Sequence, residues 1–236
     1  MNVSKIWKEN YNRSKDLCIK CDTCKYKLKP DVQIQPKFNT EISIVSKDTL
    51  DTAIKESVNG KTLLLNMANP EKPGGYPQLT GAQEEDLFRR TNLCIHLDKT
   101  LYPIGRNEVI ISKNVQVFSK GLRKRYEPLK KTESIDIVSC PAIKNTGVGS
   151  RLNHIDEQII KCRIETLFQV ASSQGYEILV LSALGCGGYR CPPEHISLIF
   201  EQVINKYKGV FKKIIFAIFD DNYPKCNYNI FKDRFQ

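Results

Sequence analysis

The chain alternates short apolar runs with longer segments of helical periodicity, and this alternation restricts its fold more than any other feature. Runs such as "TLLLNMA" are apolar almost throughout, as expected of strands covered on both faces of a sheet. We predict strands at residues 41–46, 62–68, 109–118 (which also fits a hairpin), 135–142, 177–183 and 213–219. Between them, apolar residues recur at i, i+3, i+4 and i+7, which predicts helices at residues 48–58, 83–97, 153–175 and 192–207. The pattern indicates a layered α/β domain with a parallel or mixed sheet.

The length of 236 residues suits a single domain with one large core. Residues 1–35 are polar, and we expect an irregular N-terminal extension there, followed by one domain over residues 36–236. No apolar run approaches the ~20 residues needed to span a bilayer, and the N-terminus lacks the apolar segment of a secretion signal. We therefore expect an intracellular protein, cytoplasmic or nuclear, with no membrane partner. We also expect a monomer.

The net charge of +10 favours anionic partners, either nucleic acid or small molecules that carry phosphate. The densest basic run, "KGLRKRYEPLKK" at residues 120–131, fits a nucleic-acid patch. A solvated lysine-rich loop explains the same run more simply, so nucleic acid is the less favoured partner.

Two polar loops follow predicted strands, at the edge where open α/β sheets bind their ligands. The first contains Asn69, Gly74 and Gly75 and leads into a helix that begins with the triplet Gln83, Glu84 and Glu85, with Thr80 as its expected N-cap. Stabilisation of the first turn by the helix dipole is the simplest reason for such carboxylates. Carboxylates that face a phosphate-binding loop also suit general acid and base chemistry.

The second loop, "LSALGCGGYRCPPEH", has Gly185, Gly187 and Gly188 just before the predicted helix at residues 192–207. Successive backbone N–H groups in such a turn can surround phosphate oxygens. The loop lacks the Lys-Ser/Thr pair of a P-loop, so it does not indicate hydrolysis of a nucleoside triphosphate. A tight turn without any ligand remains the alternative.

The cysteines and histidines bear on redox state and metal binding. Nine cysteines, an odd number, indicate reduced thiols rather than a disulfide framework. Three of them, Cys18, Cys21 and Cys24, have the spacing of zinc ligands, and a fourth ligand would have to be Cys226 or His96. Free thiols are the favoured reading, so we predict no metal.

Two further thiols, Cys186 and Cys191, flank the second loop and are candidates for redox sensitivity. The three histidines, His96, His154 and His195, lack paired metal spacing, and we expect them on helix surfaces or in packing positions.

The segments "NMANPEKPGG", "GGYPQLTGAQEEDLFRRTNL", "IVSCPAIKN", "LSALGCGGYRCPP" and "IIFAIFDDN" occur in an order that resembles the microbial-type poly(ADP-ribose) glycohydrolase family. The resemblance covers roughly residues 40–236. It implies a three-layer α/β/α fold of the macrodomain kind with a mixed central sheet. It also implies a hydrolase without a cofactor that cleaves the ribosidic bond of ADP-ribose attached to polymer or protein.

The same resemblance assigns roles to residues. Glu85 becomes the general acid and base, which requires a raised pKa for work near neutral pH, and Glu84 orients the ribose hydroxyls. Water attack would be assisted by the diphosphate of the substrate. The substrate-binding residues implied are Asn69, Gly74, Gly75, Tyr76, Gln83, Gly185, Cys186, Gly187, Gly188, Tyr189 and Phe219. Asn69 would hold the distal ribose, and Tyr189 would pack against the ligand.

One position departs from the family pattern, because Tyr76 stands where the third motif glycine is expected. We predict that this substitution favours a single terminal ADP-ribose over long polymer. Three alternatives stay open: a hydrolase of ADP-ribose on protein side chains through an arginine or acidic linkage, a reader without turnover, and a nucleic-acid binder.

Overall fold

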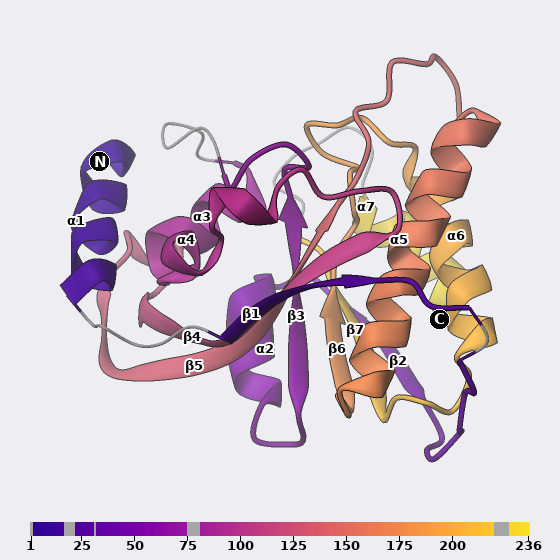
Figure 1. Cartoon of the computed structure of the whole chain (residues 1–236), viewed down its shortest axis with the longest axis horizontal. Helices are drawn as coiled ribbons and strands as arrows, with labels where there is room; N and C mark the ends of the chain where they lie inside the picture. Colours follow the sequence, from indigo (N-terminus) through magenta and orange to yellow (C-terminus); the bar gives the residue numbers. More distant parts are fainter. Residues whose placement is uncertain (1, 17–21, 31, 75–80, 220–226) are drawn as a thin grey trace.

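One mixed sheet forms the centre of the protein (Figure 1). The computed structural model describes residues 2–16, 22–30, 32–74, 81–219 and 227–236. Within them the strands are β1 (Asp22–Lys27), β2 (Glu41–Val45), β3 (Thr62–Ala68), β4 (Glu108–Ser119), β5 (Pro128–Pro141), β6 (Ile178–Leu181) and β7 (Lys213–Ala217). Their order in the sheet is β1-β4-β5-β3-β6-β7-β2. The pairs from β5 to β2 are parallel, whereas β1 and β4 add an antiparallel edge.

Helices cover both faces of this sheet. They are α1 (Val3–Asp16), α2 (Thr49–Glu56), α3 (Gln83–Arg90), α4 (Leu93–His96), α5 (His154–Ser173), α6 (Pro193–Lys206) and α7 (Asn227–Phe235). On β3, Leu63 and Leu65 join the core cluster under α5, α6 and α7, while Leu64 joins the cluster under α2, α3 and α4. This alternation follows from the two-residue period of a strand. The predicted three-layer α/β/α architecture with a mixed sheet is therefore confirmed.

The hairpin considered within residues 109–118 is wrong, because β4 runs through this region as one strand. The register between β4 and β5 shifts between Ser112 and Val115, and Asn114 there has a φ of 55°. Its backbone N–H donates to Oδ1 of Asp136 at 2.8 Å. The residues that resemble a turn therefore form a bulge, which inserts an extra residue without ending the strand.

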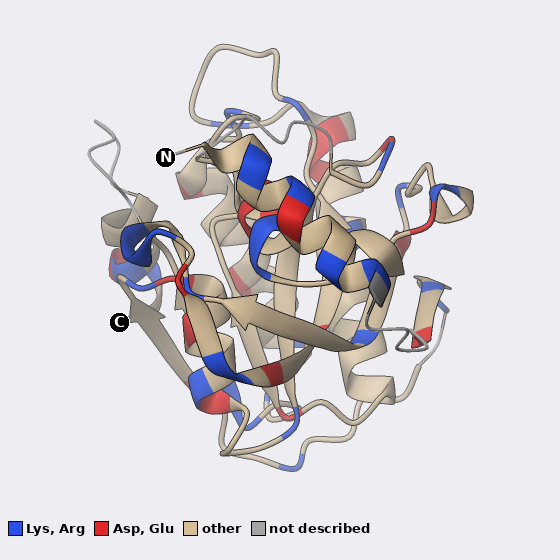
Figure 2. Cartoon of the chain, turned by 90° about the vertical axis from the view of Figure 1, so that its left-hand side faces the viewer, with Lys and Arg blue, Asp and Glu red and all other residues tan. Residues whose placement is uncertain are grey.

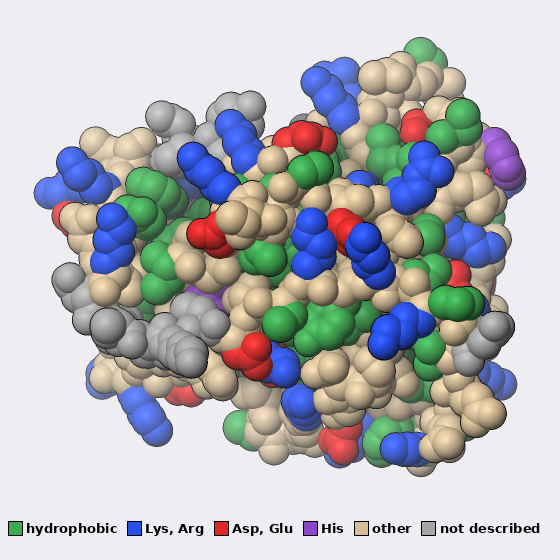
Figure 3. Space-filling view, in the orientation of Figure 1, with side chains coloured by type: hydrophobic (Ala, Val, Ile, Leu, Met, Phe, Trp, Pro, Cys, Tyr) green, Lys and Arg blue, Asp and Glu red, His purple; other side chains and the backbone are tan. Residues whose placement is uncertain are grey.

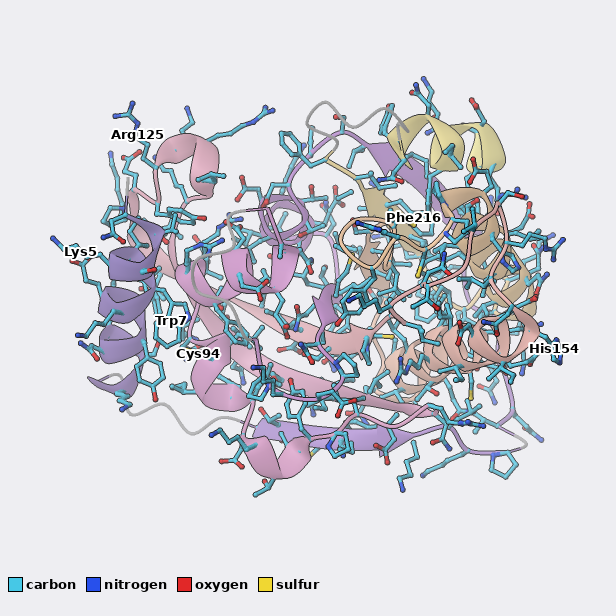
Figure 4. The ribbon with its side chains drawn as sticks, turned by 90° about the horizontal axis from the view of Figure 1, so that it is seen from above. Lys5, Trp7, Cys94, Arg125, His154 and Phe216 are labelled. Atoms are coloured by element: carbon cyan, nitrogen blue, oxygen red, sulfur yellow. The ribbon has the colours of Figure 1, made fainter. Side chains whose placement is uncertain are left out.

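The expectation of irregular backbone before residue 36 is also wrong for two segments. β1 pairs with β4 in antiparallel register from Asp22 to Lys27, and α1 lies over α3 and α4 at one end of the molecule (Figure 1). Trp7 of α1 and Cys94 of α4 both pack against the cluster under α3, and Figure 4 labels the two residues in neighbouring elements. The side-chain amide of Asn10 donates to the carbonyl of Arg89, so α1 holds the end of α3.

Charged side chains are spread over the surface. Figure 2 shows lysines and arginines along the outer side of α1, and Figure 3 shows basic and acidic groups interspersed over the face it presents. Every helix in the part of the chain that the structure describes is too short or too polar to cross a membrane.

Candidate active site

The parallel strands end at one edge of the sheet, and polar segments follow each of them (Figure 1). Along this edge, β3 is followed by Asn69, β6 by the loop around Gly185, β7 by Phe219 and β2 by Asp48. Neighbouring strands lie ~4.8 Å apart, so the three intervals from β3 to β2 span about 14 Å. The edge is therefore long enough for an elongated ligand.

Gln83 fixes the start of α3 against β3. Its Oε1 accepts a hydrogen bond from the backbone N–H of Met67 at 2.7 Å, and its Nε2 donates to the carbonyl of Leu65 at 2.7 Å and to Oγ1 of Thr49 at 3.1 Å. The N-cap of α3 is Ala82, which makes no side-chain capping bond, whereas the predicted cap, Thr80, lies outside the described residues. The side-chain amide of Gln83 therefore fixes the start of α3 in the absence of a capping side chain.

Glu84 is buried at the end of β3, with 3% of its surface exposed. Its Oε1 accepts from Nδ2 of Asn66 at 3.1 Å, and its Oε2 accepts from the backbone N–H of Asn69 at 3.0 Å. Burial raises the pKa of Glu84 to about 8, the donors from Asn66, Asn69 and Gly74 oppose this rise, and the charge of Glu85 adds to it. A carboxyl group with this pKa exchanges a proton near neutral pH.

Glu85 is buried as well, with 7% of its surface exposed. Both carboxylates lie in the first turn of α3, and the effect of Glu85 on the pKa of Glu84 places their charges close together. The structure therefore brings the two predicted catalytic carboxyl groups to the same edge as Asn69.

The loop after β3 carries the other predicted residues of this end. Oδ1 of Asn69 accepts from the backbone N–H of Glu71 at 2.8 Å, so the side chain shapes the loop. Gly74 has a φ of +52°, and a Cβ there would meet Cε2 of Phe88 at 2.3 Å. A larger residue would displace α3. Gly75 and Tyr76 lie outside the described residues.

The glycine-rich loop after β6 forms a tight turn next to this site. Gly185 has a φ of +76°, and its carbonyl accepts from the backbone N–H of Cys191 at 2.9 Å. Among the described residues, the backbone N–H groups of Gly187 and Gly188 have no protein acceptor, and a Cβ on either glycine would meet open space. These N–H groups are available to an anion, as the sequence predicts for phosphate oxygens.

Tyr189 and Cys186, also predicted to contact the substrate, are half-buried within this turn. The carbonyl of Tyr189 accepts from the backbone N–H of Asn145 at 2.8 Å, which ties the turn to the segment after β5. Sγ of Cys186 lies 3.7 Å from the carbonyl oxygen of Leu184. The neighbouring Cys191 is buried, and burial raises the pKa of its thiol to about 11, which opposes the thiolate needed for redox chemistry.

Phe219 lies at the other end of the edge. It is 40% exposed and lines a cavity of about 760 Å³ beside α2. The guanidinium carbon of Arg123, from the short 3₁₀ helix η2 (Leu122–Lys124), lies 4.0 Å from the centre of its ring. Part of the basic run at residues 120–131 therefore borders this cavity, whereas Arg125 at the end of η2 points outward in Figure 4.

The sequence reading missed a charged group under this cavity. The buried Arg90 binds three carboxylates that line it: Nη1 lies 2.8 Å from Asp48 and 3.1 Å from Asp86, and Nη2 bonds to Asp51. Burial opposes the charge of Arg90, but the three aspartates together raise its pKa, so the guanidinium stays charged. The hydroxyl of Tyr126 donates to Oδ1 of Asp86 at 2.7 Å and extends the network. An arginine inside the helical pattern of residues 83–97 was the only sequence feature that pointed to it.

The zinc hypothesis stays untested, because Cys18, Cys21 and Cys226 lie outside the described residues. Within the described ranges, no group of three or more histidine, cysteine, aspartate or glutamate side chains is arranged to hold a metal. Cys24 is exposed on β1, and the neighbouring Thr23 lies 3.3 Å from Nδ1 of His96.

The histidines occupy packing or surface positions. Burial lowers the pKa of His96 to about 4, so this residue is neutral in the folded protein. His195 is buried and its Nδ1 accepts from the backbone N–H of Leu152 at 2.9 Å. His154 is exposed at the start of α5, at the far side of the molecule from Trp7 (Figure 4).

Part of the chain is similar to a known family of catalytic domains. The model of the microbial-type PARG catalytic domain matches residues 9–121, so the likeness begins further toward the N-terminus than the motifs indicated. No curated protein sequence matches the chain.

Two solved structures are similar to this chain over nearly its whole length. Poly(ADP-ribose) glycohydrolase from Thermomonospora curvata has a TM-score of 0.78 at 22% identity, with 98% of this chain and 89% of that chain covered. The enzyme from Deinococcus radiodurans in complex with ADP-ribose has a TM-score of 0.74 at 20% identity, with coverages of 98% and 90%. At these identities the likeness establishes the fold alone, and the family model covers somewhat less than half of the chain.

Proposed function

We propose that the chain belongs to the microbial-type poly(ADP-ribose) glycohydrolase family, whose catalytic-domain model matches residues 9–121, and that it hydrolyses the ribosidic bond of ADP-ribose attached to polymer or protein. Membership of this family would make the protein a glycosidase. The observation that carries the proposal is the pair of buried carboxyl groups, Glu84 and Glu85, held at the end of β3 beside a glycine-rich turn.

The order of the strands indicates how the ligand would be oriented along the sheet edge. The distal ribose would lie at the end of β3 near Glu84 and Glu85. The diphosphate would lie on the backbone N–H groups of Gly187 and Gly188 after β6, which have no acceptor among the described residues. The adenosine would reach the cavity that Phe219 lines. The acceptor then lies on the opposite side of the carboxylates, toward β5 and β4. The structure from Deinococcus radiodurans, which has the same fold, contains ADP-ribose, in agreement with this class of ligand.

The hydrogen bonds of Glu84 support the division of roles. Both of its oxygens already accept from Asn66 and Asn69, so Glu84 is fixed in place and suits orientation of the ribose. The acid and base role falls to Glu85. Its carboxyl proton would pass to the leaving oxygen as the bond to the anomeric carbon breaks and the ribose gains oxocarbenium character.

The second half of the reaction consumes water. The substrate diphosphate would position a water molecule, whose oxygen forms the new bond to the anomeric carbon while its proton passes to the Glu85 carboxylate. The products are free ADP-ribose and the acceptor with its proton restored. A single protein carboxylate suffices in this scheme, which differs from the usual two-carboxylate glycosidase mechanism.

Turnover of defined substrates tests the proposal. Poly(ADP-ribose) and proteins that carry a single ADP-ribose on serine, arginine or an acidic side chain are incubated with the wild type, with Glu85→Gln and with Glu194→Gln. Glu194 is an exposed first-turn carboxylate of α6 and serves as the matched control. Removing the acid and base should lower turnover about 100-fold or more, because general acid–base catalysis contributes roughly 10²–10⁴-fold.

Affinity for ADP-ribose separates the enzyme from a reader. Glu85→Gln should bind ADP-ribose within a few-fold of the wild type, and Glu194→Gln should match the wild type in both binding and turnover. If the wild type binds ADP-ribose and hydrolyses none of these substrates, the chain is a reader and the proposal fails. The substrate with the highest kcat/KM identifies the linkage.

A further inference from the structure

A short loop before β4 lies against the loop that follows β3. It begins at the 3₁₀ helix η1 (Lys99–Leu101), and Tyr102 is the residue that ends this helix. Two residues further on, the backbone N–H of Ile104 donates to the carbonyl of Pro70 at 2.8 Å. Pro70 directly follows Asn69, whose N–H binds Glu84, so the loop with Tyr102 is tied to the carboxylate end of the site.

A buried arginine holds this loop from the other side. Nη2 of Arg163 donates to the carbonyl of Ile104 at 3.2 Å, and its Nε donates to the carbonyl of Gly105 at 3.2 Å. Its Nη1 donates to the carbonyls of Pro141 and Ala142 at the end of β5. The loop is therefore clamped between β3 and β5, which is the side of Glu84 where the acceptor would lie.

The hydroxyl of Tyr102 is buried and has no hydrogen-bond partner among the described residues. Its ring packs against the apolar cluster that contains Leu87 and Phe88 of α3. Burial raises the pKa of Tyr102 and the charge of Glu84 adds to the rise, so the phenol keeps its proton and can donate a hydrogen bond. Leaving such a group unsatisfied costs about 1–3 kcal/mol, which calls for an occupant.

The chemistry around this hydroxyl selects the occupant. Tyr102 offers a donor, and the oxygens of Glu84 offer an acceptor position beyond those used by Asn66, Asn69 and Gly74. Oδ1 of Asn66, whose Nδ2 donates to Glu84, is a second buried acceptor without a partner among the described residues. A group that bridges them must donate and accept at once. A sugar hydroxyl does both.

We propose that Tyr102 is a positioning residue whose hydroxyl donates a hydrogen bond to a hydroxyl of the distal ribose that Glu84 orients. This inference rests on the proposed function and names one more contact at the same site. The ribose hydroxyl would donate to Glu84 and accept from Tyr102, so the sugar is held from two sides. The contact serves only ligands that have the second ribose, because the diphosphate and adenosine lie toward β6 and β7.

Binding of two ligands to Tyr102→Phe tests the inference. The substitution keeps the ring and its packing and removes only the hydroxyl oxygen. ADP-ribose and ADP, which lacks the second ribose, are titrated by calorimetry into the wild type, Tyr102→Phe and the control Tyr207→Phe. Tyr207 is also a buried tyrosine, but it lies at the end of α6, remote from Glu84.

The expected result is a selective loss. One hydrogen bond of about 1–1.5 kcal/mol corresponds to a loss of roughly 5–13-fold in affinity. Tyr102→Phe should lose this much for ADP-ribose and change less than twofold for ADP, whereas Tyr207→Phe should change neither. In a double-mutant cycle with Glu84→Gln, the loss caused by Tyr102→Phe should shrink, since both residues hold the same hydroxyl.

Two outcomes overturn the inference. Unchanged affinity of Tyr102→Phe for ADP-ribose would mean that the hydroxyl does not reach the sugar. An equal loss for ADP-ribose and ADP would mean that the substitution loosens the site as a whole.

Binding and turnover measured on the wild type distinguish failure of this inference from failure of the proposed function. If the wild type fails to bind ADP-ribose, the proposed function and the inference fall together. If it binds ADP-ribose without hydrolysing any substrate, only the hydrolytic proposal fails, and the ratio of the two affinities still decides the role of Tyr102.

Discussion

The side chain of Gln83 binds the backbone of β3 on both sides of Asn66: Oε1 accepts from the N–H of Met67, and Nε2 donates to the carbonyl of Leu65, each at 2.7 Å. A neighbouring strand would make the same two kinds of bond. The first residue of α3 therefore extends the hydrogen bonding of the sheet, and the next two residues, Glu84 and Glu85, are placed by this contact.

Gln83→Glu should destabilise the protein and lower turnover together. The carboxylate would still accept from Met67, but it cannot donate to Leu65 or Thr49, so two acceptors lose their donor. We expect a loss of about 2–4 kcal/mol in the free energy of unfolding, measured with urea, since an unsatisfied buried group costs about 1–3 kcal/mol. A variant with wild-type stability and wild-type turnover would show that α3 is placed by other contacts.

The stability of the protein should fall between pH 4.5 and pH 8 because of Glu84. Its pKa is about 8 in the folded protein against a usual value of 4.5, so the folded state binds more protons than the unfolded state over this range. The contribution of the group is complete below pH 4.5 and is lost as the pH rises through 8. One pKa unit corresponds to about 1.4 kcal/mol, so the loss is a few kcal/mol.

Urea unfolding of the wild type and Glu84→Gln across this pH range measures the effect. The free energy of unfolding of the variant should decline less steeply with pH, because glutamine does not titrate. Glu194→Gln serves as the control and should follow the wild type. Parallel pH profiles for wild type and Glu84→Gln would rule out the raised pKa.

The fold was predictable where burial on both faces gives continuous apolar runs, and less so at the edges. β3 and β7 begin at the predicted residues, whereas β1, with the sequence "DTCKYK", lies at the sheet edge and carries too few apolar residues to be predicted. Its pairing with β4 depends on contacts that are distant in sequence. Residues 109–118 show the opposite case: a hairpin fitted this sequence, but Asn114 has a positive φ within a bulge of one continuous strand.

Some residues of the candidate site were also predictable from the sequence, whereas others were not. The residues that the motifs name come from short stretches of sequence: two loops, one helix start, and Phe219 after β7. Tyr102 and Asp48 come from other segments and join the site only through the order of the strands. Asn66, which interrupts the apolar run "TLLLNMA", also belongs to the site, because its buried side-chain amide donates to Glu84.

Tyr76 should affect the choice between polymer and a single ADP-ribose. The residue lies outside the described ranges, so this prediction rests on the sequence, where tyrosine replaces an expected glycine and Pro77 follows. A bulky side chain and a proline restrict the backbone of a loop. Tyr76→Gly should raise kcat/KM for long poly(ADP-ribose) relative to a protein that carries one ADP-ribose. An unchanged ratio would remove Tyr76 as a determinant of substrate length.

Two glycines of the turn after β6 should respond differently to alanine. At Gly185 the φ is +76° and a Cβ would lie 2.6 Å from Cβ of Ala142, so Gly185→Ala should cost about 1–3 kcal/mol or more in the free energy of unfolding. At Gly188 a Cβ meets only open space, so Gly188→Ala should leave stability within about 0.5 kcal/mol of the wild type.

Gly188→Ala should nevertheless weaken ligand binding if the turn holds the diphosphate. The new methyl group at Gly188 would occupy the space through which phosphate oxygens approach its N–H, so the affinity for both ADP-ribose and ADP should fall. Urea unfolding and calorimetric titration of Gly188→Ala measure the two effects separately. Wild-type affinity for both ligands in this variant would place the diphosphate elsewhere, whereas a weakened affinity at unchanged stability locates it on the turn between Gly185 and Tyr189.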